Sequence, residues 1–131
     1  MSIYLILMIL FAHFIADFIF QDEAWATNKW HSELALLKHV TVYTIIFTTL
    51  IAFYNMFIHT FTSEEILYIA GITFAAHYLT DFISSKIVHE AFEAKLHGTP
   101  IPNMGAFSMI GCDQFIHYLQ LFLTFHYITS V

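Results

Sequence analysis

Four long apolar stretches, separated by short polar segments, set the pattern of the chain. The apolar stretches lie near Ile3–Gln21, Glu33–Ile58, Glu65–Lys86 and Ala106–Ile128. Each is close to the roughly 20 residues that a helix needs to cross a bilayer. Inside lipid a helix satisfies its own backbone hydrogen bonds, which an open strand cannot do. The pattern therefore predicts an all-α integral membrane protein with four transmembrane helices.

The segments between these stretches carry turn and capping signals. Thr62 and Glu65 match a capping box, which predicts a very short turn between the second and third helices. Segment 98–105 is rich in glycine and proline and is expected to separate the third helix from the fourth. Segment Asp22–Ser32 is polar and contains both tryptophans, which favours an interfacial loop or short helix. Segment Ile87–Leu96 is expected to be amphipathic and to lie on the membrane surface.

Composition supports lipid as the solvent. Of the 131 residues, 59% are hydrophobic and only 11% are charged, whereas soluble domains carry about 25% charged residues. A chain of this length suits a single domain, residues 1–131. The net charge of −6 and the lack of arginine make nucleic acid an unsuitable partner.

The lysines predict an orientation. Lys29, Lys38, Lys86 and Lys95 lie in or beside the loops on one side of the predicted bundle. With four spans, both termini lie on the opposite side. Cytoplasmic loops carry an excess of basic residues, so the lysine-bearing loops are expected in the cytoplasm and both termini outside.

Ionisable residues interrupt all four apolar stretches. Three His/Asp pairs have i, i+4 spacing, and a lone histidine belongs to the second stretch: His13 and Asp17, His77 and Asp81, Asp113 and His117, and His39. This spacing places both members of a pair on one helical face. Ionisable residues inside membrane spans are unfavourable and mark functional sites by default. Because successive spans run in opposite directions, all seven residues are expected at one depth, in the leaflet nearer the lysines.

The first and third stretches also contain an internal repeat. Residues 12–19 and 76–83 share Ala, His, Asp, Phe and Ile at corresponding positions. Two tandem helical hairpins of the same orientation would then be related by an axis along the membrane normal. In this arrangement His39 and His117 are counterparts.

The pairs suggest metal binding. Neutral histidines and ionised carboxylates bind divalent ions such as Zn²⁺, Mn²⁺ and Fe²⁺. Seven candidates exceed the needs of one tetrahedral ion, so either two ions bind or some of the residues orient the ligands of a single ion. Gln21, Lys86 and Gln114 lie within about one turn of the pairs and are expected to bind substrate or orient ligands. The pattern assigns no catalytic residue.

Several functions are compatible with such a centre. A metal ion reached by water from one side could activate hydroxide, which predicts a hydrolase that acts on a lipid or another amphiphile at the interface. The alternatives are a metal or proton conduit, a bis-histidine haem bundle and a non-enzymatic protein with a structural metal. Four helices enclose a site thinly, which favours a homo-oligomer.

As a set, these motifs resemble an uncharacterised family of small four-helix membrane proteins from bacteria and their phages. The matching motifs are His13-x3-Asp17-x3-Gln21, His39, His77-x3-Asp81 with Lys86, and Asp113-Gln114-x2-His117. That family is faintly similar to the membrane-bound metal-dependent hydrolases of bacterial inner membranes. The resemblance covers nearly the whole chain. It implies a four-helix fold in the bacterial inner membrane and metal ligation at these residues, but no particular reaction.

Overall fold

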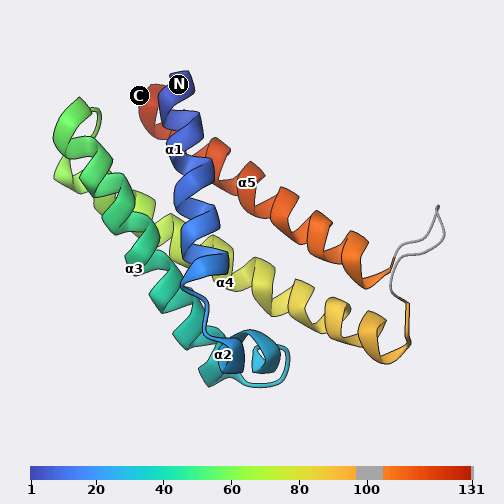
Figure 1. The fold of residues 1–131 in the computed structure, drawn as a ribbon. Coiled ribbons are helices and arrows are strands. Elements are labelled where there is room, and N and C mark those ends of the chain that lie inside the picture. Colours follow the sequence, from blue (N-terminus) through green and yellow to red (C-terminus); the bar gives the residue numbers. More distant parts are fainter. Residues whose placement is uncertain (97–104, 131) are drawn as a thin grey trace.

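The computed structural model describes residues 1–96 and 105–130, which form five α-helices and one π-helical turn (Figure 1). The elements are α1 (Ile3–Phe14), the π-helical turn η1 (Ile15–Ile19), α2 (Glu23–Asn28), α3 (Glu33–Ile58), α4 (Ser63–Glu93) and α5 (Ala106–Ser130). The described residues contain no strand, which confirms the all-α prediction for this part of the chain.

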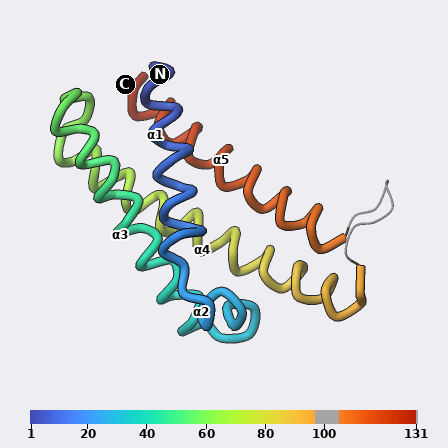
Figure 2. Tube along the Cα trace, in the orientation of Figure 1, coloured from blue at the N-terminus to red at the C-terminus, as the bar shows by residue number. Residues whose placement is uncertain are grey.

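The helices follow one another as two antiparallel hairpins. α1 and α3 form the first hairpin, with the short α2 at its turn, and α4 and α5 form the second (Figure 2). α4 also packs against α3, and α1 contacts α5, so the two hairpins make one bundle. The start of α1 and the end of α5 lie together at the end of the bundle far from α2 (Figure 1).

Side-chain caps fix where the helices begin. The carboxylate of Asp22 accepts a hydrogen bond from the backbone of α2, and the Ser32 hydroxyl accepts one from the backbone of α3. At the start of α4, Thr62 and Glu65 form the predicted capping box, with the Thr62 backbone N–H donating to Glu65 Oε2 at 2.6 Å. Such contacts satisfy N–H groups that have no partner within the helix. Segment 22–32, for which the sequence predicts a loop or a short helix, contains the short helix α2.

Two boundaries differ from the expectations. α4 continues to Glu93, past the expected end at Lys86, and so includes most of the segment Ile87–Leu96 that the sequence predicts on the membrane surface. No glycine or proline follows Lys86 before the helix ends, and nothing in the sequence stops it there. In the first stretch, regular α-helix ends at Phe14 and continues as η1 to Ile19. The turn predicted at 98–105 lies outside the described residues, except for its last glycine.

The apolar core occupies the part of the bundle nearer the termini. Its members come from all four long helices and include Leu5, Ile9, Phe47, Ile51, Ile69, Leu121 and Phe125. In α1 and α4 these residues precede the His/Asp pairs, whereas in α3 and α5 they follow His39 and His117. The polar residues therefore lie next to the core, and the core separates them from the end of the bundle where the two termini lie.

The outer faces of the long helices are strongly apolar. α3 and α4 are long and apolar enough to cross a membrane, and Ile3–Ile19 is an apolar helical segment of shorter length. Large apolar side chains are exposed on each long helix, among them Leu7, Phe11, Ile45, Phe53, Leu67, Leu79, Phe115 and Leu123. Exposed apolar surface on this scale marks an interaction with lipid or with another protein.

Candidate metal centre

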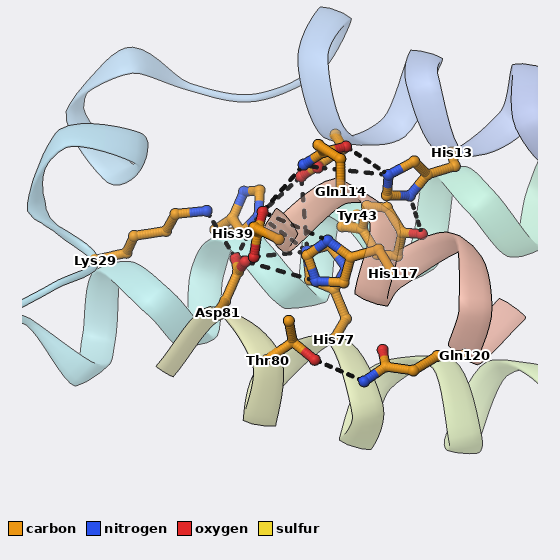
Figure 3. A network of polar contacts seen from close by, with 12 residues as sticks. His13, Lys29, His39, Tyr43, His77, Thr80, Asp81, Gln114, His117 and Gln120 are labelled. Atoms are coloured by element: carbon orange, nitrogen blue, oxygen red, sulfur yellow. Dashed lines mark hydrogen bonds and ion pairs between the residues drawn. The ribbon is translucent and has the colours of Figure 1, made fainter. Parts of the chain in front are cut away.

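Side chains from the four long helices and η1 meet in one buried cluster (Figure 3). Each member is at most 5% exposed: His13, Asp17, His39, His77, Asp81 and His117. These are six of the seven ligands predicted from the sequence. The seventh, Asp113, lies at the margin of the cluster, with Oδ2 3.7 Å from His117 Nδ1.

At the centre, two imidazoles lie between two carboxylates. The Nε2 atoms of His39 and His77 are 3.2 Å apart. Asp17 Oδ1 lies 3.2 Å from His39 Nε2 and 3.6 Å from His77 Nε2. Asp81 Oδ2 lies 3.1 Å from His39 Nε2 and 3.5 Å from His77 Nε2. Each imidazole nitrogen therefore faces the other nitrogen and two carboxylate oxygens.

This arrangement suits a divalent cation. Zinc binds histidine nitrogen and carboxylate oxygen at about 2.0–2.2 Å in a tetrahedron, whose ligand atoms are then about 3.3 Å apart. Two sets of three ligand atoms, each made of the two imidazole nitrogens and one carboxylate oxygen, have separations of 3.1–3.6 Å, which lie around that value. Hydrogen bonds alone satisfy the cluster poorly, because the carboxylates and any deprotonated imidazole nitrogen are all acceptors. Two imidazoles with two carboxylates also suit Mn²⁺ or Fe²⁺.

The π-helical turn carries one of these carboxylates. Asp17 is the central residue of η1, where the Phe20 N–H donates to the Ile15 carbonyl at 3.0 Å, one residue farther back than in an α-helix. From this turn Asp17 reaches His39 on α3 and His77 on α4. Single π-helical turns occur frequently at functional sites.

His13 is held by hydrogen bonds in this structure. The Gln114 amide donates to Asp17 Oδ2 and to Asp113 Oδ2, each at 3.1 Å. This orientation turns Gln114 Oε1 toward His13 Nε2 at 2.9 Å, so that nitrogen donates. His13 Nδ1 then accepts from the Tyr43 hydroxyl at 2.8 Å.

His117 contrasts with His13. It is 1% exposed, and neither of its ring nitrogens has a hydrogen-bond partner among the described residues. Asp81 Oδ1 also lacks a partner and lies 3.7 Å from His117 Nε2. Buried polar atoms are nearly always hydrogen-bonded, so these atoms are available to a ligand that could complete the cluster.

Sequence reasoning missed Lys29 and Tyr43. Lys29, which follows α2, donates from Nζ to Asp81 Oδ2 at 2.7 Å, and its side chain is 17% exposed. Burial lowers the pKa of Lys29, but the carboxylates of Asp81 and Asp17 outweigh it and raise the pKa above its ordinary value. Tyr43 could have been found from its i+4 spacing to His39, whereas no local pattern placed Lys29 at the cluster.

The three predicted neighbours have different positions. Gln114 lies within the cluster, as the contacts above show. Gln21 lines a pocket beside it. Lys86 instead places its ammonium over the ring of Phe82, 3.6 Å from the ring centroid.

The chain as a whole matches one protein family. The sequence profile of the family described as "Protein of unknown function (DUF3307)" matches residues 5–131. The chain belongs to this family. The match agrees with the resemblance to an uncharacterised family seen in the sequence. No match was found among curated proteins or among solved structures.

Two hollows adjoin the cluster in this DUF3307 protein. A pocket of about 450 Å³ is lined by Asp17, Lys29, Asp113 and Gln114 and by aromatic residues, including Trp30. An apolar groove of about 250 Å³ lies between α4 and α5 and is lined by residues such as Leu79, Ile87 and Ile116. Ser84 and Asp113 line both hollows, so the pocket with its charged groups and the apolar groove meet at these two residues.

Replacing Lys29 with glutamine should destabilise the metal-free protein. Asp81 would lose its ammonium partner, and breaking such a buried pair costs about 3 kcal/mol. Thermal unfolding in the presence of a chelator measures the effect, and Lys38→Gln is the matched control because Lys38 is exposed. Equal unfolding midpoints for the two variants would show that the Lys29–Asp81 contact does not support the cluster.

Proposed function

We propose that the protein is a membrane-embedded, metal-dependent hydrolase that acts on an amphiphilic substrate at the membrane interface. One observation carries the proposal: the Nε2 atoms of His39 and His77 lie at ion-binding separations from each other and from one carboxylate oxygen each of Asp17 and Asp81, beside a pocket. The membrane, the metal and the reaction are supported by separate features of the structure.

The membrane part rests on the apolar outer faces and on the placement of charge. Lipid would cover the exposed apolar side chains of all four long helices. Lys29 follows α2, Lys38 lies in the first turns of α3, and Lys86 and Lys95 lie near and just after the end of α4. α2 and these helix ends lie away from the start of α1 and the end of α5 (Figure 1). We therefore place these lysines in the cytoplasm and the termini outside. The bacterial inner membrane follows from the resemblance noted in the sequence.

Cell fractionation tests the membrane part. The full-length protein should remain in the membrane pellet after a wash with alkaline sodium carbonate and should be released by detergent, because its helices would be surrounded by lipid. Release by the carbonate wash alone would contradict integration into the bilayer.

The chemistry rests on groups around the pocket. A divalent ion bound here that keeps one coordination position open for water would lower the pKa of that water to about 7. Asp113 in the pocket wall is placed to accept a proton from water during attack. The Lys29 ammonium in the same wall is placed to stabilise an anionic oxygen of the substrate. Hydrolysis would join the water oxygen to the electrophilic atom and break the bond from that atom to the leaving group, which would take up the proton that Asp113 accepted from water.

The substrate class follows from the two adjoining hollows. The pocket offers an ammonium, two carboxylates and two amides, whereas the groove between α4 and α5 is almost entirely apolar. A molecule with a polar head in the pocket and an apolar chain in the groove would pass from one hollow to the other beside Ser84 and Asp113. Lipids and other amphiphiles have this form.

Two alternatives fit the geometry less well. A conduit needs a polar path through the bundle, but the core around Phe47 and Phe125 closes the terminal side of the cluster. A haem needs a flat space between its two histidines. Oxygens of Asp17 and Asp81 lie beside both Nε2 atoms of His39 and His77, where a porphyrin ring would have to lie.

Elemental analysis tests the metal part. Wild-type protein purified in detergent and supplied with Zn²⁺ should retain zinc after desalting, and His39→Ala should retain less because a ligand is lost. His126→Ala is the matched control, since His126 is exposed on α5. Wild type without retained zinc, Mn²⁺ or Fe²⁺ would contradict metal binding.

Reconstitution tests the reaction. Zinc-loaded protein in vesicles of phosphatidylethanolamine and phosphatidylglycerol should release cleaved lipid, detected by mass spectrometry. Asp113→Asn should slow cleavage by about 100-fold, the effect of losing a general base, while retaining zinc. Glu90→Gln, at an exposed position of α4, is the control. Retained zinc without cleavage of these lipids or of an added long-chain ester would favour a structural metal instead.

A further inference from the structure

The four buried histidines form two similar pairs. The rings of His39 and His77 have centroids 5.3 Å apart at an interplanar angle of 42°. The rings of His13 and His117 have centroids 5.5 Å apart at an angle of 51°. Between the pairs, His77 stacks on His117 with centroids 4.2 Å apart. The two pairs therefore lie side by side with similar ring separations and interplanar angles.

Each carboxylate faces both pairs, one oxygen to each. Asp17 Oδ1 and Asp81 Oδ2 lie against the Nε2 atoms of His39 and His77, as described above. Asp17 Oδ2 lies 3.7 Å from His13 Nε2, and Asp81 Oδ1 lies 3.7 Å from His117 Nε2. Ligand atoms of His13, Asp17 and His117 also lie within 4.8 Å of one another. Each aspartate thus has one oxygen beside the pair His39/His77 and the other oxygen beside a histidine of the pair His13/His117.

The internal repeat explains this symmetry. The repeat matches His13 with His77 and Asp17 with Asp81. His39 and His117 are counterparts because each belongs to the second long helix of its hairpin. Applied to the pair His39/His77, this correspondence gives the pair His117/His13. Applied to the two aspartates, it matches Asp17 with Asp81. Each histidine pair, with the carboxylate oxygens that face it, is called a half-site. The correspondence therefore relates the half-site of His39 and His77 to the half-site of His13 and His117.

We propose that the centre binds two divalent ions bridged by Asp17 and Asp81. One ion is held by His39 and His77, the other by His13 and His117, and each carboxylate gives one oxygen to each ion. This inference rests on the proposed metal-binding function and deepens it. Two-metal sites with ions about 3.5–4 Å apart are common in hydrolytic enzymes, where the ions act on the attacking and the leaving oxygen.

Unsatisfied atoms in the second half-site support a second ion. Asp81 Oδ1 and His117 Nε2 are buried without a hydrogen-bond partner among the described residues. Both atoms face the position between Asp81 and His117 that the second ion would take. A site built for one ion at His39 and His77 gives no reason for these atoms to remain unpaired.

The remaining ligand of the second half-site is already oriented. The Gln114 amide joins His13 Nε2 to Asp17 Oδ2, the two atoms that the second ion would bind. When the ion replaces this bridge, His13 Nδ1 carries the proton and donates it to the Tyr43 hydroxyl, 2.8 Å away. Metal-binding histidines almost always donate their other N–H in this way.

The number of ions bound per chain distinguishes a two-ion centre from a one-ion centre. Full-length protein in detergent is loaded with Zn²⁺, desalted, and analysed for zinc and protein. We expect two ions per chain in the wild type. One ion per chain at saturation would overturn the second site and leave the proposed metal-binding function intact, whereas no ion would overturn both.

Variants related by the repeat locate the two sites. His39→Ala and His117→Ala each remove one ligand of one ion, so each should lower the zinc content to one ion per chain or fewer. His126→Ala should keep two. Unchanged content in His117→Ala would overturn the assignment of the second ion. Circular dichroism of each variant verifies that its helices are intact.

Electron paramagnetic resonance of the manganese-loaded wild type tests the bridges without any substitution. Two Mn²⁺ ions joined by carboxylates are magnetically coupled, so the sharp hyperfine spectrum of isolated Mn²⁺ should be broadened or lost at full loading. His117→Ala should restore it. A fully loaded wild type with the spectrum of isolated ions would overturn the bridging role of Asp17 and Asp81.

Discussion

The arrangement of this protein depends on the burial of carboxylates among imidazoles inside an apolar bundle. Removing an ionised carboxylate from water costs several kcal/mol unless cations or hydrogen-bond donors replace the water. The described structure supplies part of that replacement through Lys29, which follows α2 and reaches Asp81. The ion pair between Lys29 and Asp81 therefore links α2, at the turn of the first hairpin, to a buried carboxylate of the second hairpin.

The two hairpins are incomplete without each other. The first supplies His13, Asp17 and His39, and the second supplies His77, Asp81 and His117. In the proposed two-ion centre, each ion takes one histidine from each hairpin and an oxygen from each aspartate. Assembly of the bundle and assembly of the centre are then the same event, because neither hairpin alone can surround an ion.

The centre also lies at a boundary within the bundle. On the terminal side the apolar core packs closely, with Phe47 and Phe125 fully buried. On the other side, the pocket beside α2 and the groove between α4 and α5 meet at Ser84 and Asp113. This asymmetry is what a reaction at one membrane surface requires, and it is the reason that we prefer hydrolysis of an amphiphile to transport across the bundle.

The sequence by itself determined the helices and the polar residues that share their faces. Apolar stretches, the capping box at Thr62 and the i, i+4 pairs are local patterns, and local patterns report on helix period and helix ends. The continuation of α4 past Lys86 was missed because the length that crosses a bilayer set the end of the predicted helix. The π-helical turn at Asp17 was missed because no residue pattern in the sequence predicts it.

Only the tertiary structure decided which atoms meet. The sequence could list seven candidate ligands, but it could not show that each aspartate turns one oxygen to each histidine pair, nor that Gln114 joins His13 to Asp17. It could not place Lys29 against Asp81, because the two are 52 positions apart in the chain. Such contacts depend on how the hairpins pack in space, which helix periodicity does not encode.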